Sequence, residues 1–143
     1  MSVRIFIELR KIAGLPPATW FDLVRAMYEL MLARVKLDRA RTRFLFQSQP
    51  SPMRSQPGAP LSARQEKLVQ RVAFAILCMG AQVPWRSDCL VQALAAQRWL
   101  ACAGISAPIH IGARKTAAFE AHAWLVVGER IVTGGDISTF TPF

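Results

Sequence analysis

The stretch that most restricts the fold is residues 87–103, SDCLVQALAAQRWLACA, because it leaves almost no polar face. On a helical wheel its polar side chains after the first turn are Gln92, Gln97 and Arg98. A helix that is apolar nearly all round has to be covered on most of its sides, so it lies in the middle of a domain. The sequence therefore predicts a buried central helix that begins after Ser87 or Asp88 as its N-cap.

Two further helices are expected before this central one. The first follows a Pro-Pro pair, where Thr19 and Asp22 have the spacing of a capping box with Asp in place of Glu. The second begins at another capping box, formed by Ser62 and Gln65. The apolar face of the first helix is expected to consist of residues at helical spacing: Trp20, Leu23, Met27, Leu30, Met31 and Val35.

The pattern changes after the central helix. The segments SAPIHIG, FEAHAWLVV and RIVTGGD have the alternation or the β-branched composition of strands. Gly128-Glu129 separates the last two segments by the length of a hairpin turn. Helices followed by antiparallel strands predict an α+β fold.

The predicted organisation is one globular domain with three parts. Residues 1–46 form a basic amphipathic helical segment, and residues 47–60 form a proline-rich flexible loop with little to bury. Residues 61–143 form the core, with the central helix and a small antiparallel sheet. A chain of 143 residues suffices for one real core but is too short for two of comfortable size.

Composition narrows the class of protein. No stretch approaches 18 uninterrupted apolar residues, so we expect no transmembrane helix. The three cysteines, Cys78, Cys89 and Cys102, match neither a zinc motif nor a disulfide framework in their spacing. We therefore expect a reducing, cytoplasmic location, and neither a cofactor nor a bound metal.

The net charge of +9 is unevenly distributed. Residues 1–71 contain 13 Lys and Arg against 5 Asp and Glu, whereas residues 72–143 contain 5 against 4. A basic helical segment of this kind fits nucleic acid, an anionic membrane surface or an acidic protein, but we expect a solvated helix face to explain most of it.

Cys89 has two interpretations from the residues alone. A free cysteine is among the most buried residue types, so it can be a small hydrophobe of the core. In the first turn of a helix, however, unpaired N–H groups and the positive end of the helix dipole favour the thiolate, which is the nucleophilic form.

A nucleophilic thiolate needs a base, and the chain has two histidines. His122 lies on a predicted strand between two small alanines, which leaves room for another element to approach. His110 alternates with apolar neighbours and is expected to face solvent. Asp136 is the candidate for a carboxylate that orients His122, because a hairpin at Gly128-Glu129 places it roughly opposite. Glu120 is a weaker candidate, since it shares a strand face with His122.

The ordered set of motifs from residue 60 onward resembles the lasso peptide biosynthesis B2 proteins, leader peptidases in the transglutaminase-like branch of the papain-type cysteine proteases. The matching elements are PWR before Cys89, then CLVQALAAQRWL, a Gly-Ile pair, IHIGARK, AHAW and the closing GGD. The resemblance implies a transglutaminase-like core in which the nucleophilic cysteine stands at the N-terminus of the central helix.

The resemblance also implies an activity. Cys89 attacks the bond that joins the leader to the core of a ribosomally made precursor, His122 acts as general base and then acid, and Asp136 orients His122. The main-chain N–H of Cys89 is a natural oxyanion donor. Trp85 either forms a wall of the cleft or belongs to the core.

The resemblance implies partners as well as a substrate. The chain has no room for a recognition domain before residue 60, so it is expected to act with a separate leader-recognition protein, an RRE of the PqqD-like type. An ATP-dependent macrolactam cyclase acts after the leader is removed.

Two alternatives stay open. The same Cys-His-Asp set can transfer an acyl group to an amine, as in a transglutaminase-like acyltransferase. A basic, non-enzymatic adaptor would use the charges between Arg34 and Arg43 and would weaken steeply with salt, but it leaves the SDC and AHAW motifs unexplained. Nucleic acid is not expected as a partner, and a membrane surface is not favoured.

Overall fold

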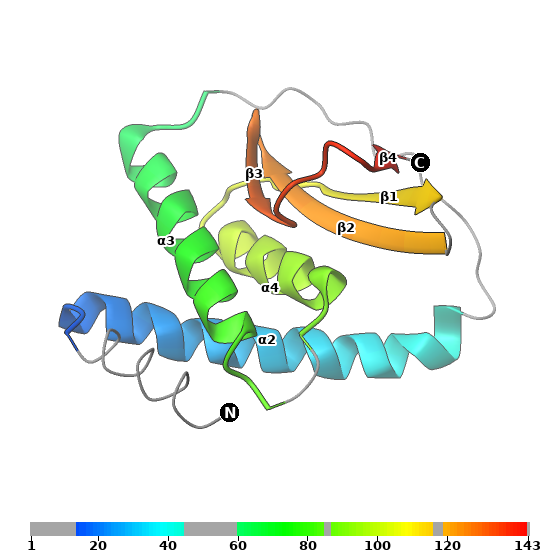
Figure 1. The fold of residues 1–143 in the computed structure, drawn as a ribbon. Helices are drawn as coiled ribbons and strands as arrows, with labels where there is room; N and C mark the ends of the chain where they lie inside the picture. The colour runs from blue at the N-terminus through cyan, green and yellow to red at the C-terminus, as the bar shows by residue number, and fades with distance from the viewer. Residues whose placement is uncertain (1–13, 45–59, 85–86, 116–118, 143) are drawn as a thin grey trace.

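The computed structural model describes residues 14–44, 60–84, 87–115 and 119–142. Within these ranges, three helices come first and four strands follow them (Figure 1). This order confirms the α+β fold class. The helices are α2 (Pro17–Phe44), α3 (Ala63–Gly80) and α4 (Cys89–Cys102), and the strands are β1 (Ile109–Lys115), β2 (Phe119–Val127), β3 (Arg130–Thr133) and β4 (Thr141–Pro142).

Helix α4 lies between the long helix α2 and the sheet, and α3 packs against both α2 and α4 (Figure 1). Six of the 14 residues of α4 are buried and all the others except Ala101 and Cys102 are half-buried, which confirms the prediction of a buried central helix. The side chains that α4 contributes to the core are Val91, Ala93, Ala95, Ala96, Trp99 and Leu100. Three small alanine side chains among them allow neighbouring elements to approach α4 closely.

The sheet contains four antiparallel strands in the order β3-β2-β1-β4. A turn at Gly128-Glu129 joins β2 to β3, as the sequence predicted. The register pairs Leu125 with Thr133 and then shifts, so that Val126 pairs with Ile131. Such a bulge increases the local twist of the hairpin next to the end of β3.

The start of α3 confirms its predicted capping box. The Ser62 hydroxyl accepts a hydrogen bond from the Gln65 main-chain N–H at 3.3 Å, and the Gln65 side chain accepts one from the Ser62 N–H at 3.0 Å. Two of the main-chain donors that a helix leaves unpaired at its beginning are satisfied in this way.

The capping box predicted for α2 was wrong. Helix α2 begins at Pro17, so Thr19 lies inside it. Asp22 is buried instead and accepts two hydrogen bonds from Arg71 of α3, at 2.8 and 2.7 Å. A carboxylate needs such a partner to be buried, and the pairing joins two helices that are far apart in sequence.

A second ion pair joins α2 to α4. Glu29 is buried, and one of its carboxylate oxygens lies 3.0 Å from Nε of Arg98. Arg25 approaches the other oxygen at 3.8 Å and places its guanidinium over the Trp99 ring, 5.1 Å from the ring centroid. The two buried carboxylates of α2, on Asp22 and Glu29, thus lie beside arginines of α3, of α4 or of the preceding turn of α2.

The apolar face of α2 differs from the prediction, because the helix is apolar on two sides. Leu23, Ala26 and Leu30 face the core and are buried. Four members of the predicted face are instead 41% to 44% exposed, namely Trp20, Met27, Met31 and Val35. Their helical spacing places them on the side of α2 away from α3 and α4.

Several expectations fall on residues that the structure does not describe. The proline-rich loop at residues 47–60 lies outside the described residues except for Pro60, as does the whole segment before Gly14. Trp85 also lies outside them. Within the described part of the chain, none of the helices is both long and apolar enough to cross a membrane.

Candidate functional site

Cys89 is the first residue of α4, which places its side chain at the positive end of the helix. Asp88 occupies the N-cap position with extended backbone, but its side chain makes no capping hydrogen bond. The chain is held there by Gln92, whose side-chain amide donates to the main-chain carbonyl of Ser87 at 3.0 Å. The thiol is half-buried, so it is neither sealed into the core nor fully solvated.

The sulfur of Cys89 touches the strand that carries His122. The main-chain N–H of Ala123 donates to Sγ of Cys89, with an N···S distance of 3.4 Å. Sulfur is only a weak hydrogen-bond acceptor. The contact therefore gives the Ala123 N–H a partner and leaves the thiol available for reaction. The structure therefore brings the start of α4 and the middle of β2 together, at the residue next to His122.

The ring of His122 is half-buried and has three neighbours, Gly134, Phe140 and the more distant Trp124, whose ring centroid is 6.2 Å away. The imidazole Nε2 lies 2.6 Å from the main-chain oxygen of Gly134. The ring of Phe140 stacks on it, with the two centroids 4.7 Å apart and the planes 27° apart. Because a carbonyl oxygen only accepts hydrogen bonds, Nε2 carries the hydrogen in the neutral ring, and Nδ1 is the nitrogen free to take a proton.

Asp136 lies beyond the end of β3, which stops at Thr133, so the predicted strand is shorter than expected. Gly134 and Gly135 both have positive φ values, 110° and 63°, and they bend the chain away from the strand direction. The Asp136 carboxylate is exposed and accepts a hydrogen bond from the main-chain N–H of Ser138 at 2.9 Å. That hydrogen bond is the main reason that the pKa of Asp136 lies below its ordinary value.

The three predicted site residues are therefore gathered in one region with different degrees of contact. Cys89 reaches β2, and His122 reaches the loop that also carries Asp136. Among these described residues, no hydrogen bond joins Cys89 to His122 or His122 to Asp136. Catalytic hydrogen bonds are often long in substrate-free enzymes and tighten in the complex, so this arrangement is compatible with a catalytic set.

Two contacts of His122 were missed by the sequence reasoning. The Gly134 contact is made by a main-chain oxygen, which any residue type would supply, although the Gly-Gly pair does mark a bend at that point. Phe140 is one aromatic residue in a short, irregular terminal segment, so its position over the imidazole leaves no pattern in the sequence.

The surroundings of Trp124 explain two of the glycines near the site. A Cβ atom at Gly112 would lie 2.7 Å from the Trp124 ring and 2.6 Å from the Thr141 carbonyl oxygen. A Cβ atom at Gly134 would collide with Cβ of Trp124. The buried indole thus fills the space that these two glycines leave, next to His122.

His110 differs from its predicted place. It is half-buried rather than solvent-facing, and its ring stacks on Trp124 with 6.0 Å between the centroids. Ile111, one of the apolar neighbours with which His110 alternates, is 46% exposed. For Glu120 the structure describes the strand but not the side chain.

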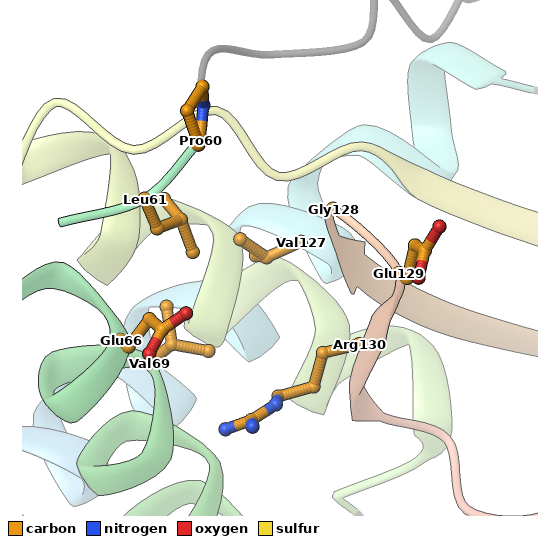
Figure 2. Close-up of a pocket in the computed structure, with 8 residues that line it drawn as sticks. All are labelled: Pro60, Leu61, Glu66, Val69, Val127, Gly128, Glu129 and Arg130. Atoms are coloured by element: carbon orange, nitrogen blue, oxygen red, sulfur yellow. The ribbon is translucent and has the colours of Figure 1, made fainter. Parts of the chain in front are cut away.

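A pocket of about 620 Å³ lies away from these residues, between the start of α3 and the β2–β3 turn (Figure 2). Leu61, Val69 and Val127 provide its apolar lining, while Glu66 and Arg130 extend into it (Figure 2). Its lining includes none of the candidate site residues. Within the described ranges, no three His, Cys, Asp or Glu side chains gather closely enough to hold a metal ion.

Comparison with protein families gives one match. The model of a transglutaminase-like superfamily domain matches residues 31–143, which covers α3, α4, the described strands and the second half of α2. No curated protein sequence and no solved structure matched the chain.

Proposed function

Because the chain belongs to the transglutaminase-like superfamily, we propose that it is a cysteine endopeptidase that removes the leader peptide from a ribosomally synthesised lasso precursor. The observation that carries the proposal is the contact of Cys89 with β2. Its sulfur stands at the start of the central helix and touches the main chain beside His122.

In the proposed reaction, Sγ of Cys89 attacks the carbonyl carbon of the scissile bond, and Nδ1 of His122 takes the thiol proton. The main-chain N–H of Cys89, unpaired within the helix as the first N–H groups of a helix are, donates to the oxygen of the tetrahedral intermediate. His122 returns the proton to the departing amine of the core peptide. The thioester left on Cys89 is then hydrolysed by water, with His122 as the base.

Asp136 is proposed as the third member, which orients the imidazole. In the structure, the Gly134 carbonyl is the group at Nε2, and Asp136 lies two residues further along the same loop. We expect Asp136→Ala to lower kcat/KM for leader cleavage at least tenfold. Cleavage at the wild-type rate would remove Asp136 from the catalytic set and leave orientation to the main chain.

The substrate and partners follow from the same proposal. The enzyme acts in the cytoplasm, before cyclisation, and takes the leader from a separate leader-recognition protein of the PqqD-like type. An ATP-dependent macrolactam cyclase receives the freed core peptide. The PWR, AHAW and GGD motifs around the site residues support this assignment within the superfamily.

The test is cleavage of a precursor peptide by the purified chain together with its recognition protein, followed by mass spectrometry. Cys89→Ala is expected to abolish cleavage and to leave the fold unchanged. Cys102→Ala is the matched control, since Cys102 is an exposed cysteine at the other end of the same helix. If Cys89→Ala cleaved the precursor at the wild-type rate, the proposal would be wrong.

Acyl transfer to an amine is the second candidate, because the same thioester serves both reactions and the superfamily match does not choose between acceptors. Adding a primary amine to the reaction separates them. A leader peptide that gains the mass of the amine indicates transfer, whereas a leader with a free carboxyl end indicates hydrolysis.

A further inference from the structure

Phe140 covers the ring of His122 instead of joining the core. Its ring centroid lies 4.7 Å from that of the imidazole, which is within the range of stacked aromatic pairs. Phe140 belongs neither to the buried core cluster nor to the partly buried side chains packed against that cluster. The buried part of the Phe140 side chain therefore faces the candidate base, His122, and not the hydrophobic core.

Arg114 of β1 holds Phe140 from a second direction. The Arg114 guanidinium lies over the Phe140 ring, 4.9 Å from the centroid, and its Nη1 donates to the Thr139 hydroxyl at 3.2 Å. A cation over an aromatic face is attracted by the negative charge of the ring face. Arg114 thus contacts both Phe140 and the residue before it.

The backbone of the terminal segment is also attached to the sheet. The N–H of Phe140 donates to the carbonyl of Ile137 at 3.0 Å, which closes a turn. Directly after Phe140, β4 pairs with β1, with Ala113 opposite Thr141. The segment therefore cannot move away from the sheet without breaking these main-chain contacts, and Phe140 is presented to His122 from a braced position.

Two contacts of different direction determine the orientation of a planar ring. The hydrogen bond from Nε2 to the Gly134 oxygen fixes rotation within the ring plane, because such bonds weaken steeply away from linearity. Stacked neighbours limit tilting of the plane. Phe140 is the nearer of the two, with 4.7 Å between the ring centroids against 6.2 Å for Trp124, so it supplies the closer restraint on tilt. Together with the Gly134 hydrogen bond, this contact holds Nδ1 in position.

We propose that Phe140 is a positioning residue for His122, held in place by Arg114. The inference rests on the proposed function, in which Nδ1 of His122 serves Cys89. Phe140 touches neither the sulfur nor the scissile bond in this scheme. It acts by keeping the imidazole in the orientation in which Nε2 stays on the Gly134 oxygen.

The test compares Phe140→Leu with Phe140→Tyr, which keeps the ring. We expect Phe140→Leu to lower kcat for precursor cleavage about tenfold to a hundredfold with KM within about twofold, because a small misplacement of a catalytic group is costly. Phe140→Tyr is expected to restore kcat to within about threefold of the wild-type value. Phe21→Leu is the matched control, since Phe21 is 76% exposed on α2.

A spectroscopic readout needs no substrate. In the wild-type protein, imidazole ¹⁵N spectra should show the neutral ring of His122 protonated at Nε2, and its carbon-bound protons should carry a ring-current displacement. Phe140→Leu should remove the displacement and speed solvent exchange of the Nε2 proton, and alkylation of Cys89 by iodoacetamide should slow. His110→Gln identifies which signals belong to His122.

A folded Phe140→Leu variant with unchanged His122 signals and unchanged kcat would overturn the inference. So would a loss confined to KM, which would make Phe140 a substrate contact. If Phe140→Leu does not fold, Arg114→Gln keeps the ring and removes the cation above it, and unchanged His122 signals in that folded variant would overturn the inference equally. A wild-type chain with the expected His122 signals and no cleavage of any precursor would contradict the proposed function instead.

Discussion

The helical layer and the sheet hold their polar groups in different ways. In the helical layer, carboxylates of α2 pair with cations from other helices, as in Asp22–Arg71 and Glu29–Arg98. At the sheet, the candidate site residues bind main-chain groups, since Cys89 takes an N–H of β2 and His122 meets a carbonyl of the following loop. The ion pairs join helices that are distant in sequence, whereas the main-chain contacts hold the Cys89 sulfur and the His122 ring in position.

Because of this difference, we expect substitutions in the helical layer to change the stability of the fold and substitutions at the candidate site to change the catalytic rate. Main-chain atoms remain when a side chain is replaced, so changing Cys89 or His122 removes a reactive group and leaves its partner backbone intact. Changing one member of an interhelical ion pair leaves the other member without its charge partner inside the protein. Substitutions at the two regions should therefore affect different measurements.

The largest effect is expected for His122→Ala. Removing a general acid and base costs about 10² to 10⁴ in rate, so kcat/KM for precursor cleavage should fall by that factor. The free energy of unfolding should change by less than about 1.5 kcal/mol, since the ring contributes two stacked pairs, the nearer with Phe140 and the more distant with Trp124, at a half-buried position. Chemical denaturation beside a cleavage assay measures both quantities, and a fully active His122→Ala would remove the base from the mechanism.

A pair of glycine substitutions sharpens the comparison within a single loop. Gly134→Ala should lower both stability and cleavage, because its Cβ collides with Trp124 and its carbonyl must then shift away from His122. We expect about 2–3 kcal/mol of destabilisation and at least a tenfold loss of kcat/KM.

Gly135→Ala is the control for that loop. Gly135 also has a positive φ, but nothing lies within 4 Å of its added Cβ. It should cost about 1 kcal/mol in unfolding free energy and leave cleavage within about twofold of wild type. Equal losses of activity in the two variants would contradict the role assigned to the Gly134 carbonyl.

The helical layer gives the opposite result, with a loss of stability alone. Arg98→Met leaves the carboxylate of Glu29, which is only 3% exposed, with the more distant Arg25 as its cation. We expect a loss of about 3 kcal/mol in unfolding free energy. Arg71→Met should cost less, about 2 kcal/mol, because its partner carboxylate on Asp22 is more exposed.

Cleavage measured well below the melting temperature should be unchanged in both arginine variants. If Arg98→Met were as stable as wild type, the ion pair would not be the element that compensates the burial of Glu29. A loss of cleavage in a fully folded Arg98→Met protein would contradict the separation of the two regions.

The local chemistry of the two regions also explains what the sequence could predict. The apolar wheel of α4, the capping box of α3 and the turn at Gly128-Glu129 are short-range patterns, and each was confirmed. The pairing of Asp22 with Arg71 spans 49 residues, and the spacing of Asp22 from Thr19 suggested a cap instead. Local spacing cannot show which distant cation a carboxylate will meet.

The candidate site shows the same limit, because its side chains could be selected from the sequence but its main-chain contacts could not. Cys89 and His122 were selected by residue type and by element, and the structure places Cys89 beside the residue that follows His122. The Gly134 contact is made by a main-chain atom and is therefore invisible to reasoning from side chains. The bend at the two glycines also ends β3 before Asp136, because their positive φ values do not continue a strand.

The smallest expected effect is a pH dependence in the loop that carries Asp136. The pKa of this carboxyl is lowered in the folded protein, chiefly by the Ser138 N–H, so the contact contributes stability above the unfolded value of about 3.9. The contribution is lost as the pH falls through the lower, folded pKa. The Ser138 amide proton should shift along that acid titration, and Asp136→Asn should abolish the shift.

The central claim is that Cys89 is the nucleophile that forms a thioester with the leader. The most direct measurement is intact-mass analysis of the protein after rapid acid quenching of a reaction with precursor peptide and recognition protein. The account predicts a species heavier by the leader acyl group, mapped to Cys89 by proteolysis and absent from Cys89→Ala. Leader cleavage that proceeds with no acylated protein, and persists in Cys89→Ala, would contradict it.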